Sequence, residues 1–402
     1  MTGPLRALLL ENIHPDGAAR LTASGIYVET EARALGPDEL AERIPGFHLL
    51  GIRSKTRVTE SVLEAGADLL SVGAFCIGTD QVDLAEASRR GVAIFNAPYS
   101  NTRSVVELAL AEIIALTRRL TEKDRSAHAG VWDKSAVRSH EVRGRSLGIV
   151  GYGNIGTQLS ILAENLGMQV YFYDTADKLA LGNARRCATL HELLGVADVV
   201  TLHVDGRAGN AGMFGAAEFA AMRSGALFLN LSRGFVVDAD SLRDHLLSGH
   251  LGGAGIDVFP HEPASTADEF ESVLRGLPNV ILTPHIGGST QEAQQDIGHF
   301  VAGKFLDYVS AGTSALSVNL PELTLPPRTG SHRLAHLHAN VPGVLAAINS
   351  VLADHAVNIE GQLLGTRGDL GYVLTDIATD YAADVVAELR ALPETVRLRV
   401  LS

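Results

Sequence analysis

The stretch Leu147-Gly148-Ile149-Val150-Gly151-Tyr152-Gly153-Asn154-Ile155-Gly156 decides the fold expected for this chain. An apolar run leads directly into the spacing G-x-G-x-x-G, and a helical pattern begins at about Ile155. A second apolar run ends at Asp174, 18 residues beyond the last glycine. The spacing alone is a weak signal in a chain with 41 glycines. The complete order of strand, glycines, helix, strand and acidic residue predicts a dinucleotide-binding βαβ unit rather than a plain strand-to-helix turn.

Each part of this motif has its own physical role. We expect Gly151 to permit the tight turn, Gly153 to let the backbone approach a pyrophosphate, and Gly156 to pack the helix on the strand. The start of the helix offers unpaired N–H groups to the anion. Asp174 is expected to accept hydrogen bonds from the adenosine ribose and to repel a 2′-phosphate, which favours NAD over NADP. The predicted cofactor-binding residues of the motif are Gly151, Tyr152, Gly153, Asn154, Ile155, Gly156 and Asp174.

Short apolar runs alternate with amphipathic stretches on both sides of the motif, a pattern typical of parallel sheets covered by helices. The runs are 5–10, 47–52, 69–74 and 92–95, then 147–151, 170–174, 198–203, 226–230, 253–257 and 280–283. The helical stretches 102–129 and 291–311 flank the second series. We therefore expect a Rossmann-type doubly wound domain (101–285) inserted in a flavodoxin-like α/β substrate domain (1–100 and 286–316).

The end of the chain predicts a separate small domain. Residues 317–330 contain three prolines without an amphipathic period and predict a linker. The tail, 331–402, has the order βαββαβ of a ferredoxin-like domain. Its expected elements are the strand 333–338, the helix 344–355, the strands 358–364 and 371–377, the helix 383–391 and the strand 396–401.

The bulk composition argues against several classes of protein. The net charge of −13 disfavours a nucleic-acid partner, because such proteins bind through clusters of Lys and Arg. Cys76 and Cys187 lie far apart and outside any disulfide or metal pattern. No basic leader precedes the first apolar run, and no run approaches the ~18 residues of a membrane span. We expect a cytoplasmic protein without metal and without membrane contact.

Polar residues follow three strands of the second series, where the carboxyl ends of parallel strands line a ligand crevice. They are Ser232-Arg233-Gly234, the segment from Asp257 to Glu262, and Pro284-His285. Oxidation of a 2-hydroxy acid needs a base with a pKa near neutrality, and His285 is the candidate. Glu262 would hold the imidazole and stabilise its charged form. Arg233 would grip a substrate carboxylate, and Asp257 is expected at the nicotinamide end of the cofactor.

Each of these residues has a simpler explanation when taken alone. Arg233 could form a surface ion pair, Glu262 could be an ordinary loop residue, and His285 is one of 15 histidines. Their occurrence at three strand ends of one sheet favours the catalytic interpretation. His285 has no second ligand at close spacing, which argues against a metal site.

The motifs resemble those of the D-2-hydroxyacid dehydrogenase family over nearly the whole chain. The similar runs are Gly144–Gly156, Asn230–Gly234, Gly255–Phe259 with Glu262-Pro263, and Thr283–Gly288. The resemblance implies that Arg233, Glu262 and His285 are catalytic and that the substrate domain is split. It also implies further NAD-binding residues, namely Leu231, Ser232, Asp257, Gly287 and Gly288.

Two loops of the first series indicate the substrate. The run Gly51-Ile52-Arg53-Ser54-Lys55-Thr56 carries two cations and a hydroxyl, and Asn96–Ser104 leads into a long helix. Both are similar to the phosphoglycerate dehydrogenases of the family, although a solvated basic loop is the alternative. The resemblance implies D-3-phosphoglycerate as substrate, oxidised to 3-phosphohydroxypyruvate in the first step of L-serine biosynthesis. The implied substrate-binding residues are Arg53, Ser54, Lys55 and Asn101, with Lys134 as a further candidate.

The tail resembles an ACT domain, a small-molecule sensor, in His336–Leu345 and Val357–Ile359. The resemblance implies that His338, Asn340 and Asn358 bind L-serine as an inhibitor at an interface between two tails, and hence a homo-oligomer, expected to be a tetramer. We expect Asn358 to begin a strand beside the one that His338 ends, while Asn340 could instead cap the following helix. At the hinge, relatives often have Gly-Gly where this chain has Gly330-Ser331.

Two other functions remain open from the sequence. The enzyme could act on another 2-hydroxy acid, such as 2-hydroxyglutarate. Alternatively, the chain could be a non-catalytic NAD-sensing protein, although the joint presence of Arg233, Glu262 and His285 argues against this function.

Overall fold

The computed structural model describes residues 4–263, 268–326, 332–377, 381 and 383–401. The chain forms two compact units, Met1–Ser100 with Gln294–Ser402, and Asn101–Ala293. The second unit extends to Ala293, beyond the expected end at His285. The reason is local, because the segment after His285 is bound to this unit: Ser104 Oγ and Thr290 Oγ1 are 2.7 Å apart.

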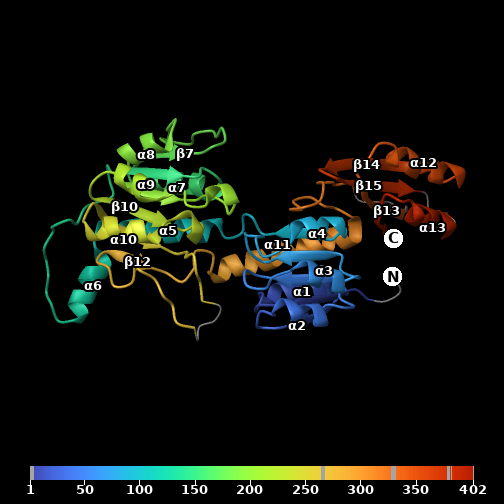
Figure 1. Ribbon diagram of the computed structural model, residues 1–402, viewed down its shortest axis with the longest axis horizontal. Coiled ribbons are helices and arrows are strands. Elements are labelled where there is room, and N and C mark those ends of the chain that lie inside the picture. The colour runs from blue at the N-terminus through green and yellow to red at the C-terminus, as the bar shows by residue number, and fades with distance from the viewer. Residues whose placement is uncertain (1–3, 264–267, 327–331, 378–380, 382, 402) are drawn as a thin grey trace. The chain divides into compact units, whose positions relative to one another are not determined.

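A five-stranded parallel sheet forms the body of the first unit (Figure 1). Its order, β2-β1-β3-β4-β5, is the expected flavodoxin-like order. The elements are β1 (Arg6–Leu9), α1 (Pro15–Ala23), β2 (Tyr27–Thr30), α2 (Pro37–Arg43), β3 (Leu49–Ile52), α3 (Glu60–Ala65), β4 (Ser71–Ala74), α4 (Leu84–Arg89) and β5 (Ala93–Asn96). The sequence did not predict β2, because this edge strand has only half-buried and exposed side chains and no apolar run marks it.

Helix α11 (Gln291–Ala311) has the predicted bounds and completes the core of the first unit. Its Val301 and Phe305 are fully buried against the sheet. Helix α11 approaches the sheet closely at Gly73 of β4, where a Cβ atom would lie 2.4 Å from Val301 Cγ1. Only glycine fits there, which explains a glycine inside an otherwise apolar strand.

The prediction of a linker over 317–330 is wrong for its described part, 317–326. Leu320 and Leu323 of this segment are buried in the core of the first unit. Asn319 holds the segment against β5, since its Oδ1 accepts the Ile94 N–H at 2.8 Å and its Nδ2 donates to Val92 O at 2.9 Å. The prolines removed the helical period but did not prevent burial. Gly330-Ser331 lies outside the described residues.

The second unit contains a seven-stranded parallel sheet of order β12-β11-β10-β9-β6-β7-β8, which is the Rossmann order extended by one strand. Its strands are β6 (Ser146–Val150), β7 (Gln169–Tyr173), β8 (Arg185–Arg186), β9 (Val199–Leu202), β10 (Ala226–Asn230), β11 (Leu251–Ile256) and β12 (Val280–Leu282). Its helices are α5 (Thr102–Thr117), α6 (Leu120–His128), α7 (Asn154–Asn165), α8 (Leu190–Val196), α9 (Ala216–Ala221) and α10 (Ala239–Leu247).

Two details of the second unit differ from the predicted elements. The expected helix 102–129 is broken into α5 and α6, because Arg119 between them has a left-handed φ of 53°. The sheet also contains the strand β8, which was not predicted. Its two residues are exposed arginines, so no apolar run signals it.

The tail forms a four-stranded antiparallel sheet of order β14-β15-β13-β16 with two helices, the predicted ferredoxin-like arrangement. The elements are β13 (His332–Ala339), α12 (Val344–Asp354), β14 (Ile359–Arg367), β15 (Leu370–Ile377), α13 (Ala383–Ala391) and β16 (Thr395–Leu401). The expectation that the second tail strand lies beside the first is wrong, because β15 separates β14 from β13. In this topology the first strand pairs with the third and the fourth.

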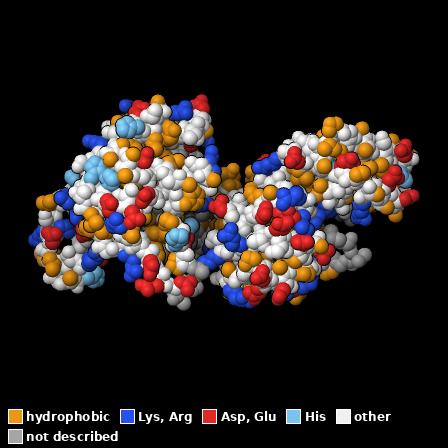
Figure 2. Space-filling model, in the orientation of Figure 1, with side chains coloured by type: hydrophobic (Ala, Val, Ile, Leu, Met, Phe, Trp, Pro, Cys, Tyr) orange, Lys and Arg blue, Asp and Glu red, His pale blue; other side chains and the backbone are white. Residues whose placement is uncertain are grey.

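No helix in the described ranges is both long enough and apolar enough to cross a bilayer. On the face shown in Figure 2, Lys and Arg side chains are interspersed with Asp and Glu.

Candidate active site

The predicted fingerprint adopts the geometry that a dinucleotide needs. Gly151 has a left-handed φ of 92°, and a Cβ atom at Gly156 would lie 2.4 Å from Gly151 O. By contrast, a Cβ atom at Gly153 would meet nothing within 4 Å, so the backbone there faces open space. Helix α7 begins after Gly153 without a side-chain cap, which leaves its first N–H groups available to an anion. These residues fit the pyrophosphate of NAD.

Asp174 lies beside the fingerprint, at the end of β7. Its Oδ2 accepts the Tyr152 N–H at 2.8 Å, and its Oδ1 accepts the Ala176 N–H at 2.8 Å. A carboxylate has about four acceptor positions, so both oxygens can still accept ribose hydroxyls. A hollow of about 290 Å³ adjoins this turn, and its lining includes Gly153, Asn154 and Lys178.

The Asp174→Ala variant is expected to bind NAD more weakly and to narrow the preference for NAD over NADP by roughly tenfold to a hundredfold, because a charge-assisted hydrogen bond and a repulsive charge are both lost. The measurement is kcat/KM with each cofactor. Asp177→Ala is the matched control, since Asp177 pairs with Arg186 at 2.7 Å and is almost fully exposed. An unchanged ratio in Asp174→Ala would show that Asp174 does not read the ribose.

Arg233 lies just past β10, as predicted. Its backbone is extended, and its Nη1 donates to Ser232 O at 2.8 Å. Asn230 holds this turn, because its Oδ1 accepts both the Ser232 N–H at 3.0 Å and the Ser232 hydroxyl at 2.8 Å. The positive charge of Arg233 also acts to lower the pKa of Glu262 and that of His285.

His285 and Glu262 meet as the sequence predicted. His285 Nδ1 and Glu262 Oε2 are 2.8 Å apart, and Glu262 Oε1 accepts the Phe259 N–H at 3.1 Å. The hydrogen bond to Glu262 raises the pKa of His285, although burial opposes this shift. Burial by itself would raise the pKa of Glu262, yet the hydrogen bond from His285 keeps this pKa below its usual value. The pair is therefore arranged to stabilise an imidazolium that has just accepted a proton.

Asp257 shapes the turn that carries His285, a role that the sequence did not reveal. His285 has a left-handed φ of 53°, which costs a non-glycine residue about 1–2 kcal/mol. The buried carboxylate of Asp257 holds the turn on both sides. It accepts the Thr283 hydroxyl at 2.6 Å, the Ile286 N–H at 2.8 Å and the Gly287 N–H at 2.8 Å. A contact between Asp257 and the nicotinamide stays a prediction.

Glu112 of α5 is a second residue that the sequence did not reveal. It is 3% exposed, and its carboxyl oxygens have no hydrogen-bond partner in the described part of the chain. Burial and the nearby charge of Asp257 raise the pKa of Glu112 to about 8. Glu112 stands in an apolar, helical stretch and had no motif that could have marked it.

Other predicted cofactor residues differ in whether their side chains or only their backbones can contact a cofactor. Tyr152 is buried and stacks on Phe172 with ring centroids 3.9 Å apart, so only its backbone belongs to the fingerprint surface. Leu231 is likewise buried in the core of the unit. A Cβ atom at Gly288 would lie 2.3 Å from Asn101 Nδ2, which places these two predicted residues side by side.

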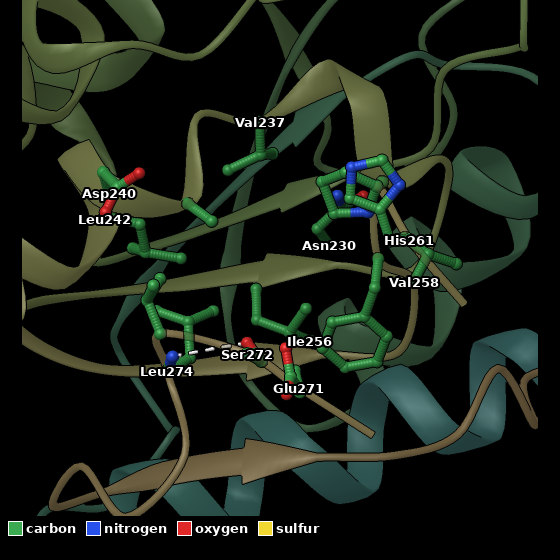
Figure 3. Close-up of a pocket in the computed structure, with 15 residues that line it drawn as sticks. Asn230, Val237, Asp240, Leu242, Ile256, Val258, His261, Glu271, Ser272 and Leu274 are labelled. Carbon is green, nitrogen blue, oxygen red and sulfur yellow. Dashed lines mark hydrogen bonds between the residues drawn. The ribbon is translucent and has the colours of Figure 1, made fainter. Parts of the chain in front are cut away.

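A separate apolar hollow of about 160 Å³ lies between the ends of β10 and β11 and helix α10 (Figure 3). Val237, Leu242, Ile256 and Val258 line it, and Ser272 Oγ accepts the Leu274 N–H at 3.3 Å at its edge. Its described lining includes the carboxylates of Asp240 and Glu271 and neither Lys nor Arg, so it does not suit an anionic substrate.

The predicted substrate loop 53–56 belongs to the first unit, after β3. Ser54 and Lys55 are exposed and Arg53 is half-buried, so the loop presents its cations at the surface. Asn101, the fourth predicted substrate residue, precedes α5 in the second unit, and its Oδ1 is buried without a hydrogen-bond partner among the described residues.

The predicted effector residues do not converge within one tail. Asn340 lies at the Ala339 end of the sheet, where its Nδ2 donates to Gly368 O at 2.9 Å instead of capping α12. Asn358 precedes β14 at the opposite end, because Ile359 pairs with Ile377 and Ile377 pairs with His332. The reason is the topology described above, which removes β14 from the side of β13.

His338 lies near Asn340 but is enclosed by the tail. It is 3% exposed, and its Nε2 has no hydrogen-bond partner within the described ranges. Its ring packs on Gly371, where a Cβ atom would lie 2.2 Å from the His338 Cε1.

Comparisons with known proteins identify the family of this chain. The profile of the D-isomer specific 2-hydroxyacid dehydrogenase NAD binding domain matches residues 110–287, and that of the AHAS small subunit-like ACT domain matches residues 334–397. D-3-phosphoglycerate dehydrogenase of Haemophilus influenzae is 48% identical over 99% of this chain and 97% of its own length. The Escherichia coli K12 enzyme of the same name is 49% identical over the same shares.

Solved structures extend the comparison to the fold. The TT0316 protein from Thermus thermophilus has a TM-score of 0.69 and 30% identity, covering 75% of this chain and 96% of that chain. A putative D-isomer specific 2-hydroxyacid dehydrogenase from Polaromonas has a TM-score of 0.70 and 27% identity, covering 76% and 96%. The chain thus belongs to the NAD-dependent D-isomer-specific 2-hydroxyacid dehydrogenases, within the group of D-3-phosphoglycerate dehydrogenases that carry an ACT domain.

Proposed function

We propose that this protein oxidises D-3-phosphoglycerate to 3-phosphohydroxypyruvate with NAD, the first step of L-serine biosynthesis. The observation that carries the proposal is the hydrogen bond of 2.8 Å between His285 Nδ1 and Glu262 Oε2 at a strand end of the nucleotide-binding sheet. The full-length similarity to D-3-phosphoglycerate dehydrogenases supports the choice of substrate.

The chemistry follows from the groups of the site. NAD held by the fingerprint around Gly151 and Gly153 would supply the acceptor for the hydride that leaves C2 of the substrate. His285 takes the proton of the C2 hydroxyl on Nε2, because its Nδ1 is bound to Glu262. Glu262 holds the imidazole and stabilises the imidazolium that forms. Arg233 binds the substrate carboxylate through its planar fork.

A substrate panel tests the proposal. The initial rate of NADH formation is compared for D-3-phosphoglycerate, D-2-hydroxyglutarate, D-glycerate and D-lactate. We expect the highest kcat/KM with D-3-phosphoglycerate, because Arg53 and Lys55 add charge for the phosphate. A higher kcat/KM with D-2-hydroxyglutarate would replace the proposed substrate, and no reaction with any hydroxy acid would favour a non-catalytic function.

We also propose that L-serine inhibits the enzyme from a site made by two tails. Serine needs neutral groups that both donate and accept, and Asn and His provide them. Strand β14 is an edge of the tail sheet, so it can pair with β14 of a second copy. Antiparallel pairing would bring Asn358 of one copy toward the end of the sheet where Asn340 of the other lies. Inhibition then requires that serine favour one domain arrangement over another.

Serine titration of the oxidation rate is expected to inhibit the wild type, to have little effect on Asn340→Ala or Asn358→Ala, and to leave the turnover of both variants without serine unchanged. Asn349→Ala is the matched control, because Asn349 of α12 bonds Gln362 within the tail at 2.9 Å. If calorimetry detects no serine binding to the wild type, or if both variants remain fully inhibited, the tail serves another ligand or only assembly.

The second unit offers a further surface for the proposed homo-oligomer, expected to be a tetramer. Helix α6 and the segment after it extend away from the sheet of this unit (Figure 1). They expose large apolar side chains, among them Leu120 at 56% and Trp132 at 81%. Exposed aromatic side chains of this kind are typical of protein interfaces.

A cytoplasmic location stays a prediction.

A further inference from the structure

Glu11 lies just after β1 in the first unit and is almost completely buried, at 7% exposed. The backbone is left-handed at both Glu11 (φ 61°) and Asn12 (φ 52°), a conformation that residues other than glycine rarely adopt. The bend is held by backbone bonds, since the Glu11 N–H donates to Arg33 O at 3.2 Å and the Asn12 N–H to Glu31 O at 3.3 Å. The fold thus maintains an uncommon bend that directs a carboxylate inward.

The carboxylate of Glu11 accepts three backbone N–H groups of the predicted substrate loop. Oε1 accepts the N–H of Arg53 at 3.0 Å and that of Thr56 at 2.8 Å. Oε2 accepts the N–H of Lys55 at 3.0 Å. N–H groups that converge in this way form an anion-binding nest. Here the protein's own carboxylate fills the nest, so these three N–H groups are not available to a substrate anion.

The side chain of Gln81, from a turn elsewhere in the first unit, also holds this loop. Gln81 Nε2 donates to Arg53 O at 2.7 Å and lies 3.3 Å from Gly78 O. Arg53 is therefore fixed at both its N–H and its carbonyl group. Thr56 at the base of the loop is fully buried, whereas Ser54 and Lys55 at its tip are exposed. The loop has a rigid base, and the side chains at its exposed tip can bind an anion.

We infer that Glu11 is a positioning residue for the substrate phosphate, holding the loop 53–56 from within so that the side chains of Arg53 and Lys55 are presented to it. The inference rests on the proposed function, which assigns this loop to the phosphate. By charge alone, a carboxylate beneath a phosphate site weakens anion binding. Glu11 therefore assists the substrate only through the loop geometry that it imposes.

The Glu11→Gln variant separates geometry from charge. The amide has the shape of the carboxylate and keeps an acceptor for Arg53 and Thr56, but it turns an NH2 group toward the Lys55 N–H. The test is the reduction of 3-phosphohydroxypyruvate and of hydroxypyruvate by NADH, two substrates that differ only in the phosphate. We expect the ratio of kcat/KM for 3-phosphohydroxypyruvate to kcat/KM for hydroxypyruvate to fall about tenfold or more, equivalent to about 1.4 kcal/mol. The fall should come from a higher KM for the phosphorylated substrate.

Two controls accompany this measurement. Glu60→Gln removes an exposed carboxylate at the start of α3 and should leave the ratio unchanged. Gln81→Ala releases the Arg53 carbonyl and should lower the ratio in the same direction, which provides a second test if Glu11→Gln does not fold.

The possible outcomes distinguish the inference from the proposed function. If Glu11→Gln slows both substrates equally, Glu11 is only structural. If its ratio rises, Glu11 acts only through charge, and either result overturns the inference. An unchanged ratio in Gln81→Ala, when Glu11→Gln cannot be measured, overturns it as well. A wild type that does not prefer the phosphorylated substrate overturns the proposed function itself, and the inference with it.

Discussion

The His285→Ala variant is expected to oxidise D-3-phosphoglycerate at least about a hundredfold more slowly than the wild type, since loss of a general base typically costs 10²–10⁴ in rate. His285 Nδ1 is bound to Glu262, so Nε2 is the nitrogen that can take the hydroxyl proton. Alanine cannot accept this proton. The loss should appear in kcat, because the step that His285 serves follows substrate binding.

The measurement is kcat from NADH absorbance, together with NADH binding followed by fluorescence. Binding should be nearly intact in His285→Ala. His191→Ala is the matched control, because His191 is an exposed histidine on α8 of the same unit. Unchanged turnover in His285→Ala would exclude His285 as the base, and loss of NADH binding would indicate damage to the cofactor site.

The Glu262→Gln variant should lower kcat by at least roughly tenfold, since the partner of a catalytic histidine fixes its tautomer and stabilises its charged form. It should also move the acidic limb of the pH profile. The hydrogen bond to Glu262 raises the pKa of His285, and oxidation requires the neutral imidazole. The wild-type rate therefore falls as pH drops through this raised pKa. Without the carboxylate the pKa of His285 falls, because burial then acts unopposed by the hydrogen bond, and the limb shifts to lower pH.

The pH dependence of kcat/KM for the wild type and Glu262→Gln checks this shift. Glu269→Gln, which changes an exposed carboxylate of the same unit, should leave the profile unchanged. A limb that stays in place in Glu262→Gln would make Glu262 a structural residue without influence on His285.

The sequence predicted most of the fold because buried parallel strands appear as apolar runs. β10, α11 and α13 have the predicted bounds. The strands that were missed, β2 and β8, have exposed side chains, so burial left no trace in their sequences. The break between α5 and α6 depends on the backbone of a single residue, Arg119, whose side chain type does not signal a left-handed conformation.

The positions of Arg233, Glu262 and His285 at strand ends were predictable from the sequence, whereas their catalytic roles stay a prediction. Contacts between distant parts of the chain were not. Glu11 and Thr56 are 45 residues apart, and only the fold brings the carboxylate beneath the loop. The position of Asn358 was predicted wrongly for a similar reason, because the order of strands in the tail sheet is decided by packing and not by their order in the chain.

Transfer of deuterium from C2 of the substrate to the cofactor is the decisive test of the proposed oxidation at C2. The protein is incubated with NAD and D-3-phosphoglycerate deuterated at C2, and the reduced cofactor is analysed by mass spectrometry. We expect one deuterium in each molecule of NADH formed, with a slower rate than for unlabelled substrate where hydride transfer limits turnover. NADH without deuterium, or no NADH at all, would exclude the proposed reaction.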